Sequence, residues 1–378
     1  MSSSIPQAGF IPADDPRRLR SELRRVMPPE SFQPQPLRGV IALGLVPVMG
    51  GLMWAAGSGR LPWWACLIIS FVLGQLVTAV GLAAHEALHH AVFRSRALES
   101  LLGWVGFSPF LVTPGNWRAW HVQAHHRAAN VLVRDPDILP RQSEWRTQWF
   151  AKVFHAMSPG SGSLLSFVSF SFFFTAQGQA FLWHHSRLPQ FKHVHMHRTR
   201  ERILTVLVIL GWVAVGWWMG PLGALYALIL PLLIGNVTLM IYIATNHWLL
   251  AAHEESDNPF VNTASVATHP VMDWLHYNFS HHQEHHIFPA MSPKFAPLLR
   301  KHLRELNPEA SQVYPHLHAL RMLYRRPALY SEDGQTLMAS SGAPAIATEV
   351  LRRQLTEPEP HPPHAKASSP RSSRPWSP

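Results

Sequence analysis

The chain has 378 residues, of which 47% are hydrophobic and only 14% charged, and its formal net charge is +10. Soluble domains carry about a quarter charged residues, so this deficit argues against a soluble protein and for one that spans a membrane. The cations flank apolar segments, which argues against a nucleic-acid-binding protein, and the single Cys66 excludes an intrachain disulfide and thiolate-ligated metal clusters.

Four apolar runs set the predicted architecture. Residues 1–35 are polar and proline-rich, and we expect a cytoplasmic N-terminal arm with arginines close to the membrane. Runs near the ~20 residues that a bilayer requires follow at 37–56 and 63–84. Two more, at 203–219 and 222–245, flank a predicted turn at Gly220 and Pro221. We therefore predict an all-α integral membrane fold with four transmembrane helices, and the distribution of Lys and Arg places both termini in the cytoplasm.

Three further segments complete this outline. Residues 98–113 are apolar but short, and we expect them to be re-entrant or to lie in the membrane interface. Residues 163–182 are diluted by Ser, Thr and Gln, and we expect an interfacial segment or a shallow hairpin. The membrane domain is thus expected to cover residues 36–328, and residues 329–378 form a predicted low-complexity, disordered tail.

Histidines dominate the candidate site. The chain has 25 of them, and three clusters stand out: HEALHH at 85–90, HVQAHH at 121–126 and HHQEHH at 281–286. Residues three and four apart on a helix share a face, so each cluster can present several imidazoles together. Under the predicted topology all three lie on one side of the membrane. Nine imidazoles exceed the needs of one metal ion and suit two, and iron is the metal that activates O2 to break unactivated C–H bonds.

Other interpretations remain open for these residues. Isolated histidines near a membrane surface are usually interfacial polar groups. The segments His85–His89 and His281–His285 also match the HExxH and HxxEH patterns of zinc proteases, although neither explains the cluster at His121. A lipid-binding protein without catalytic activity is a third possibility, which predicts that the histidine clusters are dispensable.

The set HEALHH, HVQAHH and HHQEHH resembles the three histidine boxes of membrane fatty acid desaturases, and Asp135-Pro136-Asp137 and the residues around the third box are similar to that family too. The resemblance implies a four-span helical fold whose cytoplasmic helical cap holds the boxes. It implies two iron ions, O2 as co-substrate, a fatty acyl chain as substrate and an external electron donor of the ferredoxin or cytochrome b5 type. The ligands it implies are His85, His90, His121, His125, His126, His282, His285 and His286, with His89 as a ligand or neighbour of one and His247 as the additional histidine near the last span.

Supporting roles follow for nearby residues. Glu86, Asp135 and Asp137 are candidates to orient ligating imidazoles, with solvated carboxylates as the alternative. Trp117, Trp120 and Trp274 are candidates to line an acyl tunnel or to anchor at the interface, and Arg118 is a candidate to hold an anionic head group. A related di-iron hydroxylase or carotenoid ketolase would use similar boxes and differ in its product.

Overall fold

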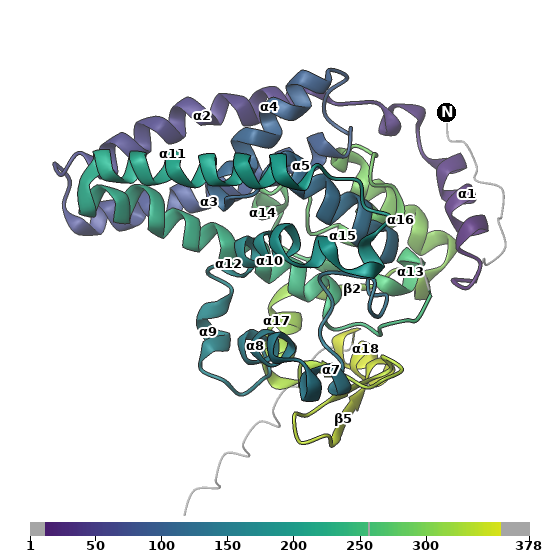
Figure 1. The fold of residues 1–378 in the computed structure, drawn as a ribbon. Coiled ribbons are helices and arrows are strands. Elements are labelled where there is room, and N and C mark those ends of the chain that lie inside the picture. Colours follow the sequence, from purple (N-terminus) through teal and green to yellow (C-terminus); the bar gives the residue numbers. More distant parts are fainter. Residues whose placement is uncertain (1–11, 256–257, 357–378) are drawn as a thin grey trace, which may run out of the picture.

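The computed structural model describes residues 12–255 and 258–356. Long helices form an arm at one end, and shorter helices with two small sheets form a body at the other (Figure 1). The arm contains the long helices, with the following bounds: α2 (Pro36–Gly57), α3 (Trp63–Leu88), α11 (Arg198–Ala224) and α12 (Leu230–His247), the last two joined by the π-helix η6 (Leu225–Ile229).

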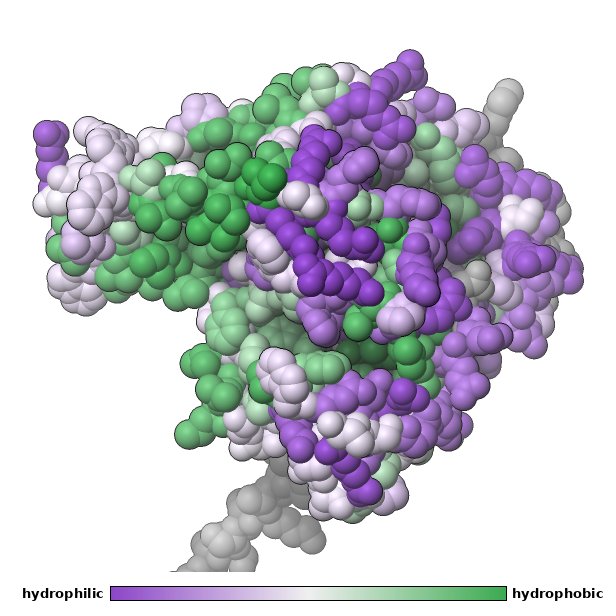
Figure 2. All heavy atoms as spheres, in the orientation of Figure 1, coloured by the Kyte–Doolittle hydropathy of each residue, from purple (hydrophilic) through white to green (hydrophobic). Residues whose placement is uncertain are grey.

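Three stretches of the described chain are long and apolar enough to cross a membrane, and all three lie in the arm. They are Pro36–Gly57, Trp63–Leu88 and the 50-residue stretch Arg198–His247. The outer surface of the arm is apolar (Figure 2), and side chains such as Trp217 are as much as 88% exposed. Apolar surface of this extent is typical of a face that contacts lipid.

The third stretch reverses direction inside its length. Gly220 adopts φ 71° and ψ 172°, a left-handed conformation that glycine reaches without the clash of a Cβ atom. In Figure 1 the chain consequently turns back toward the body between α11 and α12. The break coincides with the turn predicted at Gly220 and Pro221.

Short helices build most of the body. Their bounds are α1 (Pro16–Val26), α4 (Arg96–Phe107), α5 (Pro114–Trp117), α6 (His126–Ala128), α7 (Gln142–Thr147), α8 (Trp149–Met157), α9 (Leu165–Ser169), α10 (Phe173–Trp183), α13 (Pro259–Asn262), α14 (Pro270–Leu275), α15 (His282–Ile287), α16 (Ala296–Leu306) and α17 (His316–Arg325). The π-helix η3 (Arg118–His125) connects α5 to α6. The two segments expected at the interface, 98–113 and 163–182, fall in α4 with the turn after it and in α9–α10, and neither forms a helix long enough to span.

The described part of the predicted N-terminal arm, from residue 12, packs against the body. Helix α1 buries Leu19 and Leu23 in a separate apolar cluster together with Leu299 and Leu303 of α16. This cluster also contains Ile287 at the end of α15. The packing of α1 and α16 therefore supports the short helix that carries the third histidine box.

The prediction of a disordered tail from residue 329 is wrong for residues 329–356. They form an antiparallel sheet of β3 (Leu329–Tyr330), β4 (Thr336–Met338) and β5 (Pro344–Ala347), followed by α18 (Thr348–Thr356). Tyr330 is fully buried and donates a hydrogen bond to the Leu250 carbonyl at 2.7 Å, and Leu351 and Leu355 are fully buried too. The remaining predicted tail, residues 357–378, lies outside the described residues. A second sheet pairs β1 (Ser265–Ala267) with β2 (Val313–Pro315) in parallel.

Candidate metal centre

The histidine boxes sit where the arm meets the body. His85 lies in the last turn of α3 and His89 is the residue that caps it, while the second box spans η3 and α6. The third box forms α15, and His247 is the last residue of α12. Segments up to 200 residues apart in the sequence thus converge on one region, as the sequence predicts.

The structure sorts nine histidines into two groups. The five-histidine cluster consists of His85, His89, His121, His126 and His285. The four-histidine cluster consists of His125, His247, His282 and His286. Within each group, one ring nitrogen per residue lies within 4.8 Å of all the others.

Neighbouring residues of the second and third boxes belong to different clusters. The Nε2 atoms of His121 and His126 are 3.0 Å apart, whereas His125 belongs to the other cluster. A regular α-helix would place His121 and His125 on one face, as the spacing predicts. Residues 118–125 instead form a π-helix, whose wider turn brings residues five apart together. In the third box the ordinary four-residue spacing pairs His282 with His286 in one cluster, and His285 points to the other.

The contacts between the rings are nitrogen to nitrogen and close. The Nε2 atoms of His85 and His121 are 2.9 Å apart, and those of His247 and His282 are 2.8 Å apart. The Nδ1 of His85 donates to Glu86, so in a neutral ring its Nε2 carries only a lone pair. That lone pair can accept a hydrogen bond from an Nε2–H group of His121 or bind a cation.

Burial disfavours the charged, doubly protonated form of these rings. It is the main factor that holds the pKa of His121, His126 and His282 well below its ordinary value, and the neighbouring imidazoles lower it further. The rings are therefore neutral, the state that binds metal. Two nitrogens that each lie about 2.1 Å from one metal ion, in directions at right angles, are roughly 3.0 Å apart. The closest nitrogen pairs of both clusters have this spacing. The buried Nε2 of His89 has no hydrogen-bond partner, so the donor set fits a bound metal.

Carboxylates lie near the Nδ1 atoms of three of the rings and orient them. Glu86 Oε1 accepts from His85 Nδ1 at 2.9 Å and lies 3.7 Å from His285 Nδ1. Asp135 Oδ1 accepts from His125 Nδ1 at 2.9 Å, and Asp137 Oδ2 lies 3.6 Å from the same nitrogen. Burial would lower the pKa of His125, but Asp135 and Asp137 outweigh it and raise the pKa. A carboxylate that receives the Nδ1 proton fixes the tautomer and directs Nε2 toward the cluster.

A buried ion pair, which sequence reasoning did not find, supports the third box. Glu284 is fully buried between the metal-facing histidines, and its Oε1 accepts from Arg300 Nε at 2.6 Å while Oε2 accepts from the Ser265 hydroxyl. Burial would raise the pKa of Glu284, but Arg300 and Ser265 lower it below its ordinary value. Gln283 is also fully buried and bonds the backbone of Phe260, Ala310 and Gln312. No local sequence pattern connects Arg300 to the box.

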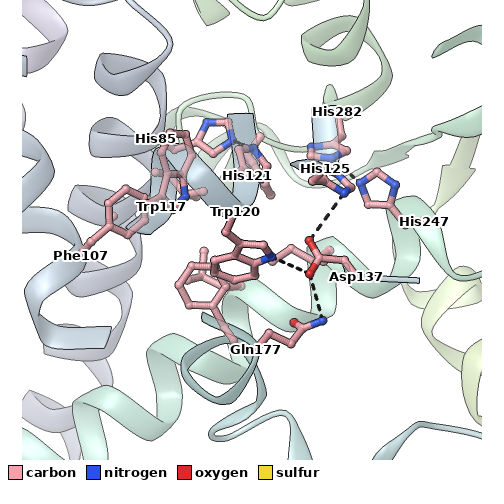
Figure 3. Close-up of a pocket in the computed structure, with 16 residues that line it drawn as sticks. His85, Phe107, Trp117, Trp120, His121, His125, Asp137, Gln177, His247 and His282 are labelled. Carbon is pink, nitrogen blue, oxygen red and sulfur yellow. Dashed lines mark hydrogen bonds and ion pairs between the residues drawn. The ribbon is translucent and has the colours of Figure 1, made fainter. Parts of the chain in front are cut away.

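A narrow cavity opens beside both clusters. Figure 3 shows Trp117, Trp120 and Phe107 on one side of it and Gln177 and Asp137 on the other, with His85, His121, His125, His247 and His282 above. The Trp120 indole donates to Asp137 Oδ1 at 2.8 Å, and Gln177 reaches the same oxygen at 3.5 Å. The cavity is therefore apolar except at the histidines and at this three-residue bridge.

Three sequence-predicted site residues are not brought to the centre. His90 follows the end of α3, adopts φ 68° and is exposed. Its ring contacts Glu99 and Arg96 rather than either cluster. His89 occupies the place that the resemblance gave to His90. Trp274 is 72% exposed and is absent from the cavity lining. The Nη2 atom of Arg118 lies 3.8 Å from Oε2 of the buried Glu99, and Arg118 does not line the cavity either.

Comparison with known proteins identifies the family. The profile described as "Fatty acid desaturase" matches residues 61–318, more than half of the chain. The chain belongs to the fatty acid desaturase family. All three histidine boxes and His247 of this desaturase-family chain lie inside the matched range.

Individual relatives are distant. The chain is 25% identical to the omega-6 fatty acid desaturase, endoplasmic reticulum isozyme 2, of Glycine max over 40% of each chain. It is 24% identical to the Delta(8)-fatty-acid desaturase of Euglena gracilis over 58% of this chain and 56% of the relative. It is 23% identical to the acyl-lipid (9+3)-(E)-desaturase of Dimorphotheca sinuata over 74% of this chain and 79% of the relative. The matches to the first two relatives thus span about half of their length or less.

Proposed function

We propose that this protein is a di-iron enzyme that uses O2 to introduce a double bond into a fatty acyl chain. In this reaction two neighbouring CH2 groups each lose one hydrogen, and O2 takes up these hydrogens with two electrons and two protons to give two waters. The observation that carries the proposal is the division of nine histidines into two adjacent ligand sets. One metal ion needs about four such ligands, and iron accepts imidazole readily.

The metals, when bound, supply the O2 chemistry, and the chain supplies position. His85, His89, His121, His126 and His285 would hold one ion, and His125, His247, His282 and His286 the other. Glu86 and Asp135 keep the protons of His85 and His125 on Nδ1, which leaves Nε2 free as a ligand atom. The burial of the site limits access of water, which protects a reactive centre from side reactions.

The acyl chain has an apolar route to this centre. A groove of about 640 Å³ runs between α8, α10 and the loop after Leu132, a size typical of sites for small molecules. Gln177 lines both this groove and the narrow cavity at the histidines, so its bridge to Asp137 and Trp120 separates the two spaces. Exposed Trp149 and Phe150 lie at the groove, where they would meet the bilayer. We infer that an acyl group of a membrane lipid enters here and that the bridge opens to admit it.

The topology completes the proposal. We infer that the stretch Arg198–His247 crosses the membrane twice, once on each side of Gly220, which gives four crossings. Arg198, Arg200 and Arg202 precede the first of these crossings. Positive charge at the body end of the arm supports a cytoplasmic location for the body, the histidine boxes and both termini.

The zinc-protease interpretation accounts for less of the geometry. The Glu of HExxH lies behind His85, bonded to its Nδ1. The Glu of HxxEH is fully occupied by Arg300 and Ser265. Neither carboxylate resembles a base that activates water on a single zinc ion, and one zinc leaves five or more histidines without a role.

Lipid mass spectrometry in a host with saturated acyl chains tests the proposal. The wild type is expected to produce acyl chains lighter by two hydrogens, whereas a hydroxylase or ketolase would produce chains that contain added oxygen. His282→Ala is expected to abolish the product and to lower bound iron from two ions per chain. His90→Ala, which changes an exposed histidine of the first box, is the control and should behave as the wild type. Identical unsaturated lipids from the wild type and His282→Ala would refute the proposal.

A further inference from the structure

The end of the body farthest from the apolar arm carries concentrated positive charge (Figure 1). Helix α1 has five arginines and one glutamate among its 11 residues. All five arginines are exposed: Arg17, Arg18, Arg20, Arg24 and Arg25. Exposed Lys301 and Arg304 of the neighbouring helix α16 extend the same charge. We call these seven residues the basic face.

The packing of α1 holds this charge outward. Leu19 and Leu23 on one side of the helix are fully buried in the cluster that contains Leu299 and Leu303 of α16. Asp15 caps the helix by accepting from the Arg18 amide at 3.1 Å. The arginines on the opposite side therefore have fixed backbone positions, and Figure 2 shows hydrophilic surface in this region.

A hollow in the basic face borders the segment that follows the third histidine box. Arg17, Arg20 and Arg24 line one side of it, and residues 287–291 line the other. These residues follow His286 directly in the chain. Phe288, two residues after His286, packs edge-on against Phe32 with the ring centroids 5.3 Å apart. The Arg24 guanidinium lies 4.2 Å from the centre of the Phe32 ring. A protein seated in the hollow would thus lie against the segment that holds the four-histidine cluster.

We propose that the basic face is the docking site for a small acidic electron-carrier protein, an inference that rests on the proposed function. The reaction consumes two electrons per double bond. A one-electron carrier gives up one electron in each encounter and is oxidised, so two encounters supply one turnover. Charge complementarity favours an acidic carrier and accelerates its association. A bilayer around the arm does not reach this face, which lies at the opposite end of the molecule (Figure 1).

Binding of a reduced [2Fe–2S] ferredoxin to the full-length protein in lipid nanodiscs tests the proposal without requiring turnover. Combined Arg17→Glu, Arg20→Glu and Arg24→Glu substitutions are expected to raise the Kd about tenfold or more at low salt and to weaken its dependence on ionic strength. The control variant carries the same charge change at three exposed cations of other elements, Arg146→Glu, Lys152→Glu and Arg187→Glu, and is expected to leave the Kd unchanged. Equal effects of both variants, or no effect of either, would overturn the docking site.

A second measurement separates this inference from the proposed function and from misfolding. Lipid desaturation is compared with ferredoxin and with a small-molecule reductant, and bound iron is measured in each variant. The α1 variant is expected to retain its iron and its activity with the small reductant, and to lose activity only with ferredoxin. If the variant also loses iron, the basic face supports the ligands rather than a partner, and the inference fails. Absence of product from the wild type with either reductant would instead refute the proposed function.

Discussion

Replacing Arg300 with Met should leave the carboxylate of Glu284 buried without its partner. The two side chains make two contacts, Nε–Oε1 at 2.6 Å and Nη2–Oε2 at 3.3 Å, and Arg300 is only 12% exposed. With about 4 Å between the charge centres and an effective dielectric constant near 20, their attraction is about 4 kcal/mol. This agrees with the roughly 3–5 kcal/mol that loss of one partner costs a buried ion pair. We therefore expect Arg300→Met to shift the equilibrium between ordered and disordered α15 by about a thousandfold.

Iron retention and thermal unfolding measure this effect. Purified protein is dialysed against a weak chelator, and its iron content and unfolding midpoint are compared with those of the wild type. The single variant should lose iron from both clusters, because α15 contributes ligands to both. The double variant Arg300→Met with Glu284→Gln removes the unpaired charge and keeps an acceptor for Ser265, so it should recover most of the loss. A single variant as stable as the wild type, or a double variant no better than the single one, would refute the reasoning.

Three further outcomes are expected from other parts of the site. Asp135→Asn should weaken iron binding about 10- to 100-fold with little change in fold, because the amide no longer fixes the tautomer of His125. An unchanged iron affinity in a metal competition titration would contradict this. Gly106→Ala should lower the unfolding midpoint, because the new Cβ would lie 2.5 Å from the Cβ of Ala84, in the helix that carries His85. The control Gly211→Ala, whose Cβ would have no atom within 4 Å, should leave the midpoint unchanged or higher. Removing iron by chelation should lower the unfolding midpoint, and Fe²⁺ should restore it, because a metal that binds only the folded ligand sets stabilises the fold. An unfolding midpoint that does not change with the metal would contradict two bound ions.

The sequence predicts the long helices and the gathering of the boxes because both depend on local patterns. Apolar runs define the arm, and the spacing of His85 with His89 and of His282 with His286 gives the faces that the structure has. The position of His90 outside both clusters was not predictable from the motif, since it depends on where α3 ends and on the left-handed backbone at His90.

Features that depend on distant contacts or on unusual helix geometry were not predictable in the same way. Nothing in HVQAHH reveals a π-helix, so the sequence does not predict that His121 joins His126 in one cluster while His125 joins the other. Arg300 reaches the third box only after α16 folds back onto α15. The segment 329–356 has the composition of a tail, and only the few apolar side chains that it buries, such as Tyr330, give it structure.

The assignment of His125 and His126, and of His285 and His286, to opposite clusters ties the two ligand sets together covalently. Adjacent Cα atoms are about 3.8 Å apart, a distance that no domain movement can stretch. A pair of metals held in this way keeps a nearly constant separation when the groove opens or a partner arrives. Adaptation to different substrates is therefore expected in the groove and at the Gln177 bridge, while the spacing between the two ions stays the same.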